Sequence, residues 1–211
     1  MRPSNAWLPV LRPYTPISDL SEPGFIDLLV KKYPGGKASS HLHSLQPGEA
    51  LTFVVPLKGY AWTPNRHSHI YLLAGGAGIT PMYQLIQGVL KNPEDRTKVT
   101  LVFGVNSKED VVLREELDAF ESQYPDRFKV VYTISSNNTA TEGESHHFKQ
   151  GRITESLLRS VMKSDEEGVK VFVSGPPAME AALMGSNGWG NSGAGGILGK
   201  LGYTKDQIYK F

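Results

Sequence analysis

Hydrophobic runs of strand length alternate with helical patterns from His69 onward. The apolar runs are rich in β-branched residues and cover Ile70–Ala74, Val99–Phe103, Phe128–Ile134 and Val169–Val173. The helical patterns cover Met82–Lys91, Leu113–Ser122, Thr154–Met162 and Ala178–Met184. Strands that alternate with helices of this size are typical of βαβ units, so the pattern predicts an α/β fold around a parallel sheet.

The first part of the chain differs, because its short apolar runs are broken by turn residues. Phe25–Lys31 and Ala50–Val55 have the composition of strands, and Ser39–Leu45 is expected to form one short helix. We expect residues 1–57 to form one unit and the polar, turn-rich residues 58–68 to be a linker.

Residues 69–211 then form the sheet domain, and three of its segments carry their own signals. Residues 137–145 are polar and predict an exposed loop, and the glycine-biased residues 185–199 predict a flexible one. Residues 205–211 are expected to form a last strand.

The stretch Leu73–Met82 has the most specific local pattern, a buried strand followed by a glycine-rich turn and a helix start. Its glycines allow a tight turn and close approach to a ligand, Thr80 suits an N-cap, and Pro81 suits the first helical position. A helix N-terminus beside such a turn favours a phosphate group, although the dinucleotide fingerprint G-x-G-x-x-G is not met. A tight turn without a ligand is the alternative. Ser174–Pro177 also follows a strand directly, so both turns are expected at one edge of the sheet.

Composition excludes several classes of function. Cysteine is absent, which removes disulfides, thiolate catalysis and iron–sulfur clusters. The net charge of +1 does not indicate nucleic acid as a partner, and no apolar run approaches the length of about 20 residues that spans a bilayer. The chain is therefore expected to be soluble. The six histidines lack a third ligand at fixed spacing, so no metal site is expected.

Four segments in order resemble the NADH–cytochrome b5 reductase family of ferredoxin-reductase-like flavoenzymes: RPYTPIS from Arg12, GGKAS from Gly35, GGAGITPM from Gly75 and SGPPAM from Ser174. The final LGYTKDQIYKF resembles fungal mitochondrial members. The resemblance implies a C-terminal NAD-binding domain preceded by a small antiparallel FAD-binding β-barrel. This chain begins about eleven residues before RPYT, so only part of that barrel is expected here.

The resemblance also implies which residues bind FAD. Arg12 would pair with the flavin diphosphate, since its planar guanidinium suits phosphate oxygens. Tyr14 would pack on the flavin and Thr15 would hydrogen-bond near its N5. The helix start at Gly36 would face the pyrophosphate. The full set implied for FAD is Arg12, Pro13, Tyr14, Thr15, Lys31, Tyr33, Gly36, Lys37, Ala38 and Ser39.

A second set is implied for NADH: Gly76, Ala77, Thr80, Pro81, Asp110, Gly175, Pro176, Pro177 and Met179. A carboxylate at Asp110 would accept from the ribose 2′-OH and repel a 2′-phosphate, which favours NADH over NADPH. The alternative is that Asp110 is an ordinary acid in a first helical turn. Ser174 and Thr15 would be the catalytic pair. The family has cysteine where this chain has Ser174, and commonly threonine where it has Ala77. Slower hydride transfer is therefore our hypothesis.

By resemblance, hydride would pass from NADH to FAD, and single electrons would pass from FAD to cytochrome b5 or a similar haem protein. The sequence does not distinguish a haem protein from a quinone or a ferric chelate as the electron acceptor. The alternative hypothesis is that the chain is a nucleotide-binding fragment that holds no flavin. Family members suggest a mitochondrial location (outer membrane or intermembrane space) or the surface of the endoplasmic reticulum. Their membrane anchor would precede the residues of this chain.

Overall fold

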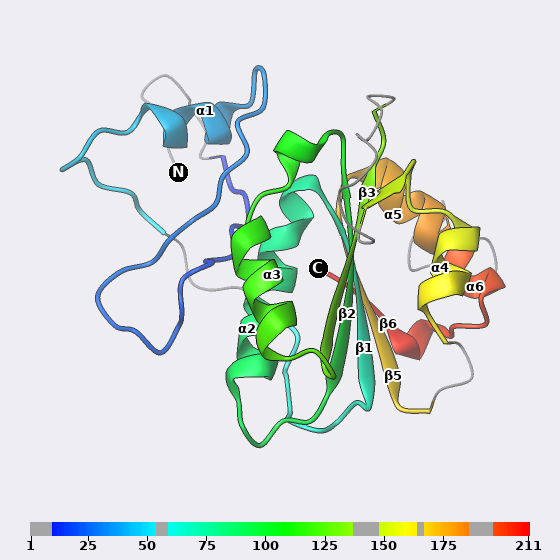
Figure 1. Ribbon diagram of the computed structural model, residues 1–211. Coiled ribbons are helices and arrows are strands. Elements are labelled where there is room, and N and C mark those ends of the chain that lie inside the picture. Colours follow the sequence, from blue (N-terminus) through cyan, green and yellow to red (C-terminus); the bar gives the residue numbers. More distant parts are fainter. Residues whose placement is uncertain (1–9, 54–58, 137–147, 164–166, 186–195) are drawn as a thin grey trace.

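The computed structural model describes residues 10–53, 59–136, 148–163, 167–185 and 196–211 (Figure 1). Within these residues, six parallel strands form one sheet in the order β4-β3-β2-β1-β5-β6. The strands are β1 His69–Gly75, β2 Lys98–Val105, β3 Phe128–Ile134, β4 Phe148–Gln150, β5 Val169–Ser174 and β6 Ile208–Lys210. The predicted parallel sheet is confirmed.

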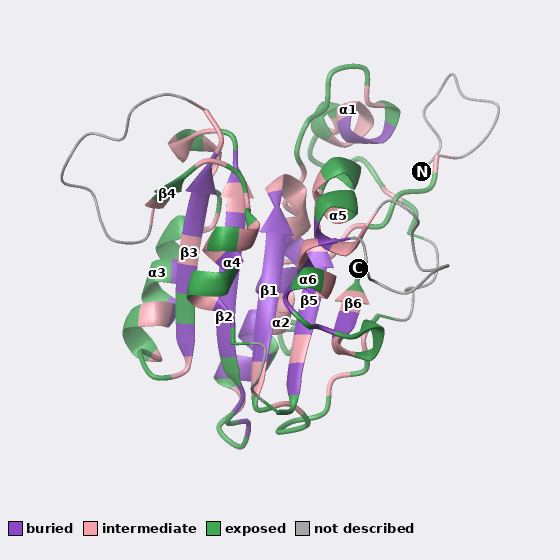
Figure 2. Cartoon of the chain, turned by 90° about the vertical axis from the view of Figure 1, so that its right-hand side faces the viewer, coloured by how far each residue is buried: buried purple, intermediate pink, exposed green. Residues whose placement is uncertain are grey.

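Helices cover both faces of the sheet. α2 (Ile79–Lys91) and α3 (Arg114–Gln123) lie on one face, and α4 (Glu155–Val161), α5 (Pro177–Met184) and α6 (Ile197–Lys200) lie on the other (Figure 1). Successive side chains of each strand point to opposite faces of the sheet, so the hydrophobic core consists of two clusters, one on each face. Leu72 packs in the cluster on the α2 side and Leu73 in the cluster on the α4 side, and both are fully buried. Burial on both faces explains why these strands read as continuous apolar runs (Figure 2).

Two elements of the sheet domain were not predicted. β4 has three residues, too few for an alternating pattern to show. α6 overlaps the end of the segment 185–199 that was expected to be a loop, and it forms there because Leu198 is fully buried against the α4 side of the sheet. Residues 137–145 and 186–195 lie outside the described residues.

The start of α2 differs from the prediction. Gly76–Gly78 form a 3-10 turn that continues directly into the α-helix at Ile79. Gly78 already has helical angles (φ −64°, ψ −6°), so no extended N-cap position remains for Thr80. Thr80 and Pro81 are the second and third helical residues, and the Thr80 hydroxyl donates back to Ala77 O at 3.2 Å.

Residues 10–53 contain one helix, α1 (Lys37–Ser44), and no strand. The strand predicted at Phe25–Lys31 is wrong, as is the described part of Ala50–Val55, residues 50–53. A strand needs a ladder of backbone hydrogen bonds, and here Ile17 N donates to Asp27 O while Asp27 N donates to a side chain, Ser18 Oγ. α1 lies beyond the carboxyl ends of the strands in both views (Figures 1 and 2).

Residues 59–68 pack on the sheet domain. The Tyr60 ring meets Phe172 edge-on at 4.9 Å and Tyr209 at 5.0 Å, and Trp62 Nε1 donates to the buried Asp95 at 2.8 Å. These contacts hold the chain where it enters β1. The division of the chain at residues 57 and 68 stays a prediction.

Candidate functional site

The sheet has one topological switch point, at the carboxyl ends of β1 and β5. From β1 the chain proceeds through β2 and β3 to β4, and then returns to place β5 on the other side of β1. Ala74 pairs with Phe103 of β2 and with Ser174 of β5. Ligands of open α/β sheets bind outside the strands at such a point. Both turns predicted to bind the nicotinamide nucleotide therefore begin there.

The two turns are in direct backbone contact. A Cβ built on Gly78 would lie 2.5 Å from the Ser174 carbonyl carbon and 2.9 Å from Gly175 N. Real Cβ atoms do not approach other atoms so closely, so only glycine fits at position 78. The backbones of the two turns, which are about a hundred residues apart in the sequence, thus pack directly against each other.

Met179 of α5 fills the remaining space between the turns. A Cβ on Gly75 would lie 2.6 Å from Met179 Sδ, and one on Gly175 would lie 2.6 Å from Met179 Cε. Met179 also packs on the core cluster of the α4 side. Its contacts here are with protein, so the structure gives it a packing role that the sequence did not indicate.

Gly76 lies on the side of the two turns where the backbone is not covered by Met179. Its φ of +51° lies in the left-handed region, and a Cβ there would meet no atom within 4 Å. Glycine adopts this conformation without the strain of other residues. The backbone of Gly76 and Ala77 is half-buried and accessible to a ligand at the carboxyl edge.

Ser174 is the last residue of β5 and is half-buried. Pro176 and Pro177 follow it, and Pro177 begins α5. Because proline has no amide hydrogen, an anion at this helix start would be held by Gly175 and by residues after Pro177.

The GGKAS segment forms a closed turn at the start of α1. Gly35 has φ +70°, and Ser39 Oγ donates to Gly36 O at 3.3 Å and accepts from Tyr33 N at 3.2 Å. Ser39 and Ala38 are buried, whereas Lys37 is exposed. The Ser39 hydroxyl therefore shapes the turn from inside, and the first amides of α1, which has no side-chain cap, remain for a ligand.

The RPYT segment lies near this turn. Burial raises the pKa of Tyr14, the Arg12 charge opposes that rise, and Tyr33 adds to it, so the three side chains are close enough to interact. Arg12 is exposed and its Nη1 donates to Leu11 O at 2.7 Å. Pro13 is exposed and Thr15 half-buried. Tyr14 and Tyr33, which are both predicted to bind the flavin, are therefore within electrostatic range of each other.

Asp110 connects the two predicted cofactor regions. It ends the 3-10 turn Lys108–Asp110 after β2, and its Oδ2 accepts from Ser107 N at 3.3 Å. Its Oδ1 lies 3.9 Å from Lys31 Nζ. Both side chains are more than a third exposed, so this ion pair contributes little to stability.

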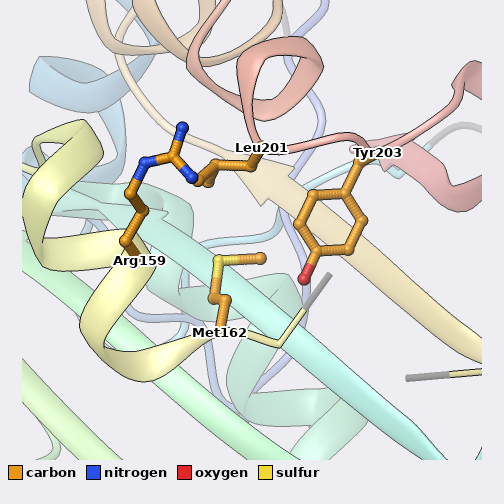
Figure 3. A pocket seen from close by; sticks show the side chains of 4 residues that line it. All are labelled: Arg159, Met162, Leu201 and Tyr203. Atoms are coloured by element: carbon orange, nitrogen blue, oxygen red, sulfur yellow. The ribbon is translucent and has the colours of Figure 1, made fainter. Parts of the chain in front are cut away.

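A separate cavity of about 310 Å³ lies on the α4 side of the sheet (Figure 3). Arg159, Met162, Leu201 and Tyr203 line it, and none of them belongs to the predicted cofactor set. In the described ranges no group of three or more His, Asp or Glu side chains lies together as a metal site requires. Among those same residues, no helix combines the length and apolar character needed to cross a membrane.

The described residues thus combine a parallel sheet that has a glycine turn at its switch point with a segment that carries a second helix start. The family described as oxidoreductase NAD-binding domain matches residues 72–184, and the oxidoreductase FAD-binding domain family matches residues 7–62. The NADH-cytochrome b5 reductase 2 of Pyricularia oryzae is 46% identical over 213 residues, which cover 100% of this chain and 63% of that protein. The chain belongs to the oxidoreductase NAD-binding domain family, and over its whole length it is similar to fungal NADH-cytochrome b5 reductases.

Solved structures agree with this assignment. The cytochrome b5 reductase domain of Ulva prolifera nitrate reductase has 27% identity and a TM-score of 0.79, over 96% of this chain and 79% of that one. The CS-b5R domains of human Ncb5or in the NAD+ form have 26% identity and a TM-score of 0.76, over 97% and 58%. The chain spans 60–63% of the length of the first curated relatives that it matches.

Proposed function

We propose that this chain carries the flavin and nicotinamide sites of an NADH-dependent cytochrome-b5 reductase. The observation that carries the proposal is the direct contact of the Gly75–Thr80 and Ser174–Pro177 turns at the switch point of the sheet. The two family matches, which together extend over residues 7–62 and 72–184, support the same function.

The residues present fit both cofactors. The start of α1 would hold the FAD pyrophosphate through its first amides and Lys37. Arg12 would pair with the same diphosphate, and Tyr14 would pack on the flavin. When bound, FAD supplies a two-electron acceptor that can release electrons singly. A Cβ on Gly76 would meet no atom of the described residues within 4 Å, so Gly76 and Ala77 would support the nicotinamide nucleotide. The chain's own part is to orient the two rings against each other.

Two further roles belong to this proposal. Asp110 would accept from the 2′-OH of the adenosine ribose. Its Oδ1 lies 3.9 Å from Nζ of Lys31, a residue of the set implied for FAD. Ser174 would lie beside the nicotinamide and Thr15 beside the flavin. A hydroxyl is less polarisable than a thiol, so Ser174 would position the ring while giving slower hydride transfer.

The electron acceptor is proposed from the names of the relatives, which are cytochrome b5 reductases. Lys31, Lys32 and Lys37 are exposed on the part of the chain that would hold the flavin, so they would face an acidic haem protein. A mitochondrial or endoplasmic-reticulum location follows from the family resemblance in the same way.

The test is the visible absorption spectrum of the purified chain after FAD is added and the excess is removed. Retained flavin bands that bleach with NADH and recover when oxidised cytochrome b5 is added are the expected result. Bands that bleach but do not recover with cytochrome b5 indicate another acceptor. A colourless protein indicates the alternative, a nucleotide-binding fragment without reductase activity of its own, and contradicts the proposal.

A further inference from the structure

A row of polar side chains follows one face of α2. Gln84, Gln87 and Lys91 have the spacing i, i+3, i+7, which places them on one side of the helix. The neighbouring face is apolar and buried against the sheet through residues such as Met82 and Ile86. Gln87 is nevertheless only 6% exposed, so something other than water must satisfy its amide.

Those partners are residues 17–19, at the end of residues 12–19, which we call the strap because this segment begins with RPYT and is attached to α2 at its other end. Gln87 Nε2 donates to Ile17 O at 2.8 Å, and Gln84 Nε2 donates to Ser18 O at 3.0 Å. Lys91 Nζ donates to Asp19 Oδ2 at 2.8 Å. Three successive strap residues are therefore bound by three side chains of one helix.

Gln87 is the centre of this arrangement. Its Nε2 binds the strap, and its Oε1 accepts from Lys91 Nζ at 3.1 Å. The amide of Gln87 supplies both a donor and an acceptor here, whereas a carboxylate of the same length would face the Ile17 carbonyl oxygen with no hydrogen to share.

The strap is also held from its other side. Ile17 N donates to Asp27 O at 2.8 Å, and Asp27 N donates to Ser18 Oγ at 3.1 Å. The Ile17 side chain packs on the core cluster of the α2 side, and Ser18 is 8% exposed. Residues 17–19 are thus fixed on the helix in one register.

This attachment links the two halves of the proposed site through one rigid element. α2 begins at Ile79, immediately after the turn that touches Ser174. Gln87 lies about 12 Å further along the helix, at 1.5 Å per residue. Thr15 precedes Ile17 by two residues, a reach of about 7 Å at most. A displacement of the strap on α2 therefore moves Thr15 relative to Ser174.

We propose that Gln87 is a positioning residue, which holds the strap on α2 and so sets the separation between the flavin and nicotinamide sites. The inference rests on the proposed function. Hydride transfer needs its two atoms about 3–3.5 Å apart, and a misplacement of about 1 Å costs up to about a hundredfold in rate. Loss of the Gln87 bonds is expected to slow the chemical step and to leave the affinity for NADH unchanged.

The first measurement is the distance between the strap and the sheet domain. The chain has no cysteine, so spin labels can be placed at Leu20→Cys, the residue next to the strap, and at Ala119→Cys in α3, both at exposed positions. The label-to-label distance distribution is compared in the otherwise native chain, in Gln87→Met, which keeps the side-chain length, and in Gln87→Glu. Gln123→Met is the matched control, because Gln123 is exposed at the end of α3. Lys91→Met removes the bonds of Lys91 to Asp19 and Gln87 but leaves the bond from Gln87 to Ile17 O, so a smaller effect is expected.

The second measurement is anaerobic single-turnover reduction of the FAD-loaded chain over a range of NADH concentrations. A broader distance distribution and a limiting rate lowered about ten- to a hundredfold, with unchanged NADH affinity, support the proposal for both Gln87 variants. An unchanged distribution, or an unchanged limiting rate, overturns it. If the native chain holds no FAD, the proposed function fails, while the distance measurement still decides whether Gln87 fixes the strap.

Discussion

Replacing Gly78 with alanine tests whether backbone contact between the two turns holds the site together. The added Cβ would lie 2.5 Å from the Ser174 carbonyl carbon and 2.9 Å from Gly175 N. Carbon atoms rest about 3.5–4.0 Å apart, so the turns would have to separate by about 1 Å. The obstructing atoms are backbone, which cannot turn aside as the end of a long side chain can.

The cost can be worked from the same contacts. Overpacking costs about 1–3 kcal/mol, and a backbone obstruction belongs at the upper end of that range. Alanine stiffens the unfolded chain, which returns about 0.4–1 kcal/mol. The φ of Gly78 is −64°, so no backbone strain is added. We expect the free energy of unfolding to fall by about 2 kcal/mol, and the limiting rate of flavin reduction by up to about a hundredfold.

Urea titration and anaerobic stopped-flow reduction by NADH measure the two effects. Gly88→Ala is the matched control, because Gly88 lies within α2 and its Cβ would meet no atom within 4 Å. That change should raise stability by about 0.5–1 kcal/mol and leave the rate unchanged. Native stability and rate in Gly78→Ala would refute the reasoning.

Three further changes address other parts of the molecule. Burial lowers the pKa of His67 below its ordinary 6.5, and the charges of Lys170 and Arg66 lower it further. The stability that the neutral His67 side chain contributes to the fold is therefore fully present above pH 6.5 and is lost as the pH falls from 6.5 through the lowered pKa. Urea titrations at a series of pH values should show a stability loss through this range that is smaller in His67→Gln, and equal slopes would contradict this. Asp95→Ala leaves the buried Thr97 N and the half-buried Trp62 Nε1 without their acceptor, so we expect the free energy of unfolding to fall by about 3 kcal/mol in urea titration. A fall of under about 1 kcal/mol would contradict this. Ser174→Cys should raise the limiting rate of flavin reduction in stopped flow, and a rate at or below the native value would count against the proposed role of Ser174.

The sheet domain was predictable because its information is local. A strand buried on both faces must be apolar throughout, so the run Ile70–Ala74 locates β1, His69–Gly75, to within a residue at each end. The same holds for β3, predicted and observed at Phe128–Ile134. Alternation with helices then determines that the strands are parallel, since each crossover returns the chain to the same edge.

Local pattern was insufficient in the first part of the chain. Phe25–Lys31 has strand-like composition, yet it lacks the ladder of neighbours that defines a strand. Composition describes one segment, whereas pairing is a property of two. The short β4 was missed for a related reason, because its place in the sheet comes from β3 rather than from its own three residues.

At the site, the residue types were legible in the sequence but their partners were not. Glycines in the Gly75–Gly78 turn predict close approach, and the fold decided that the approaching atoms belong to Ser174 and Gly175. Gln87 and its neighbours lie in a segment that the sequence predicted only as a helix, and the strap that they bind lies 66 to 72 residues earlier in the chain. Backbone periodicity acts over a few residues, so it can be read directly, whereas contacts between distant segments exist only once burial of the core has brought those segments together.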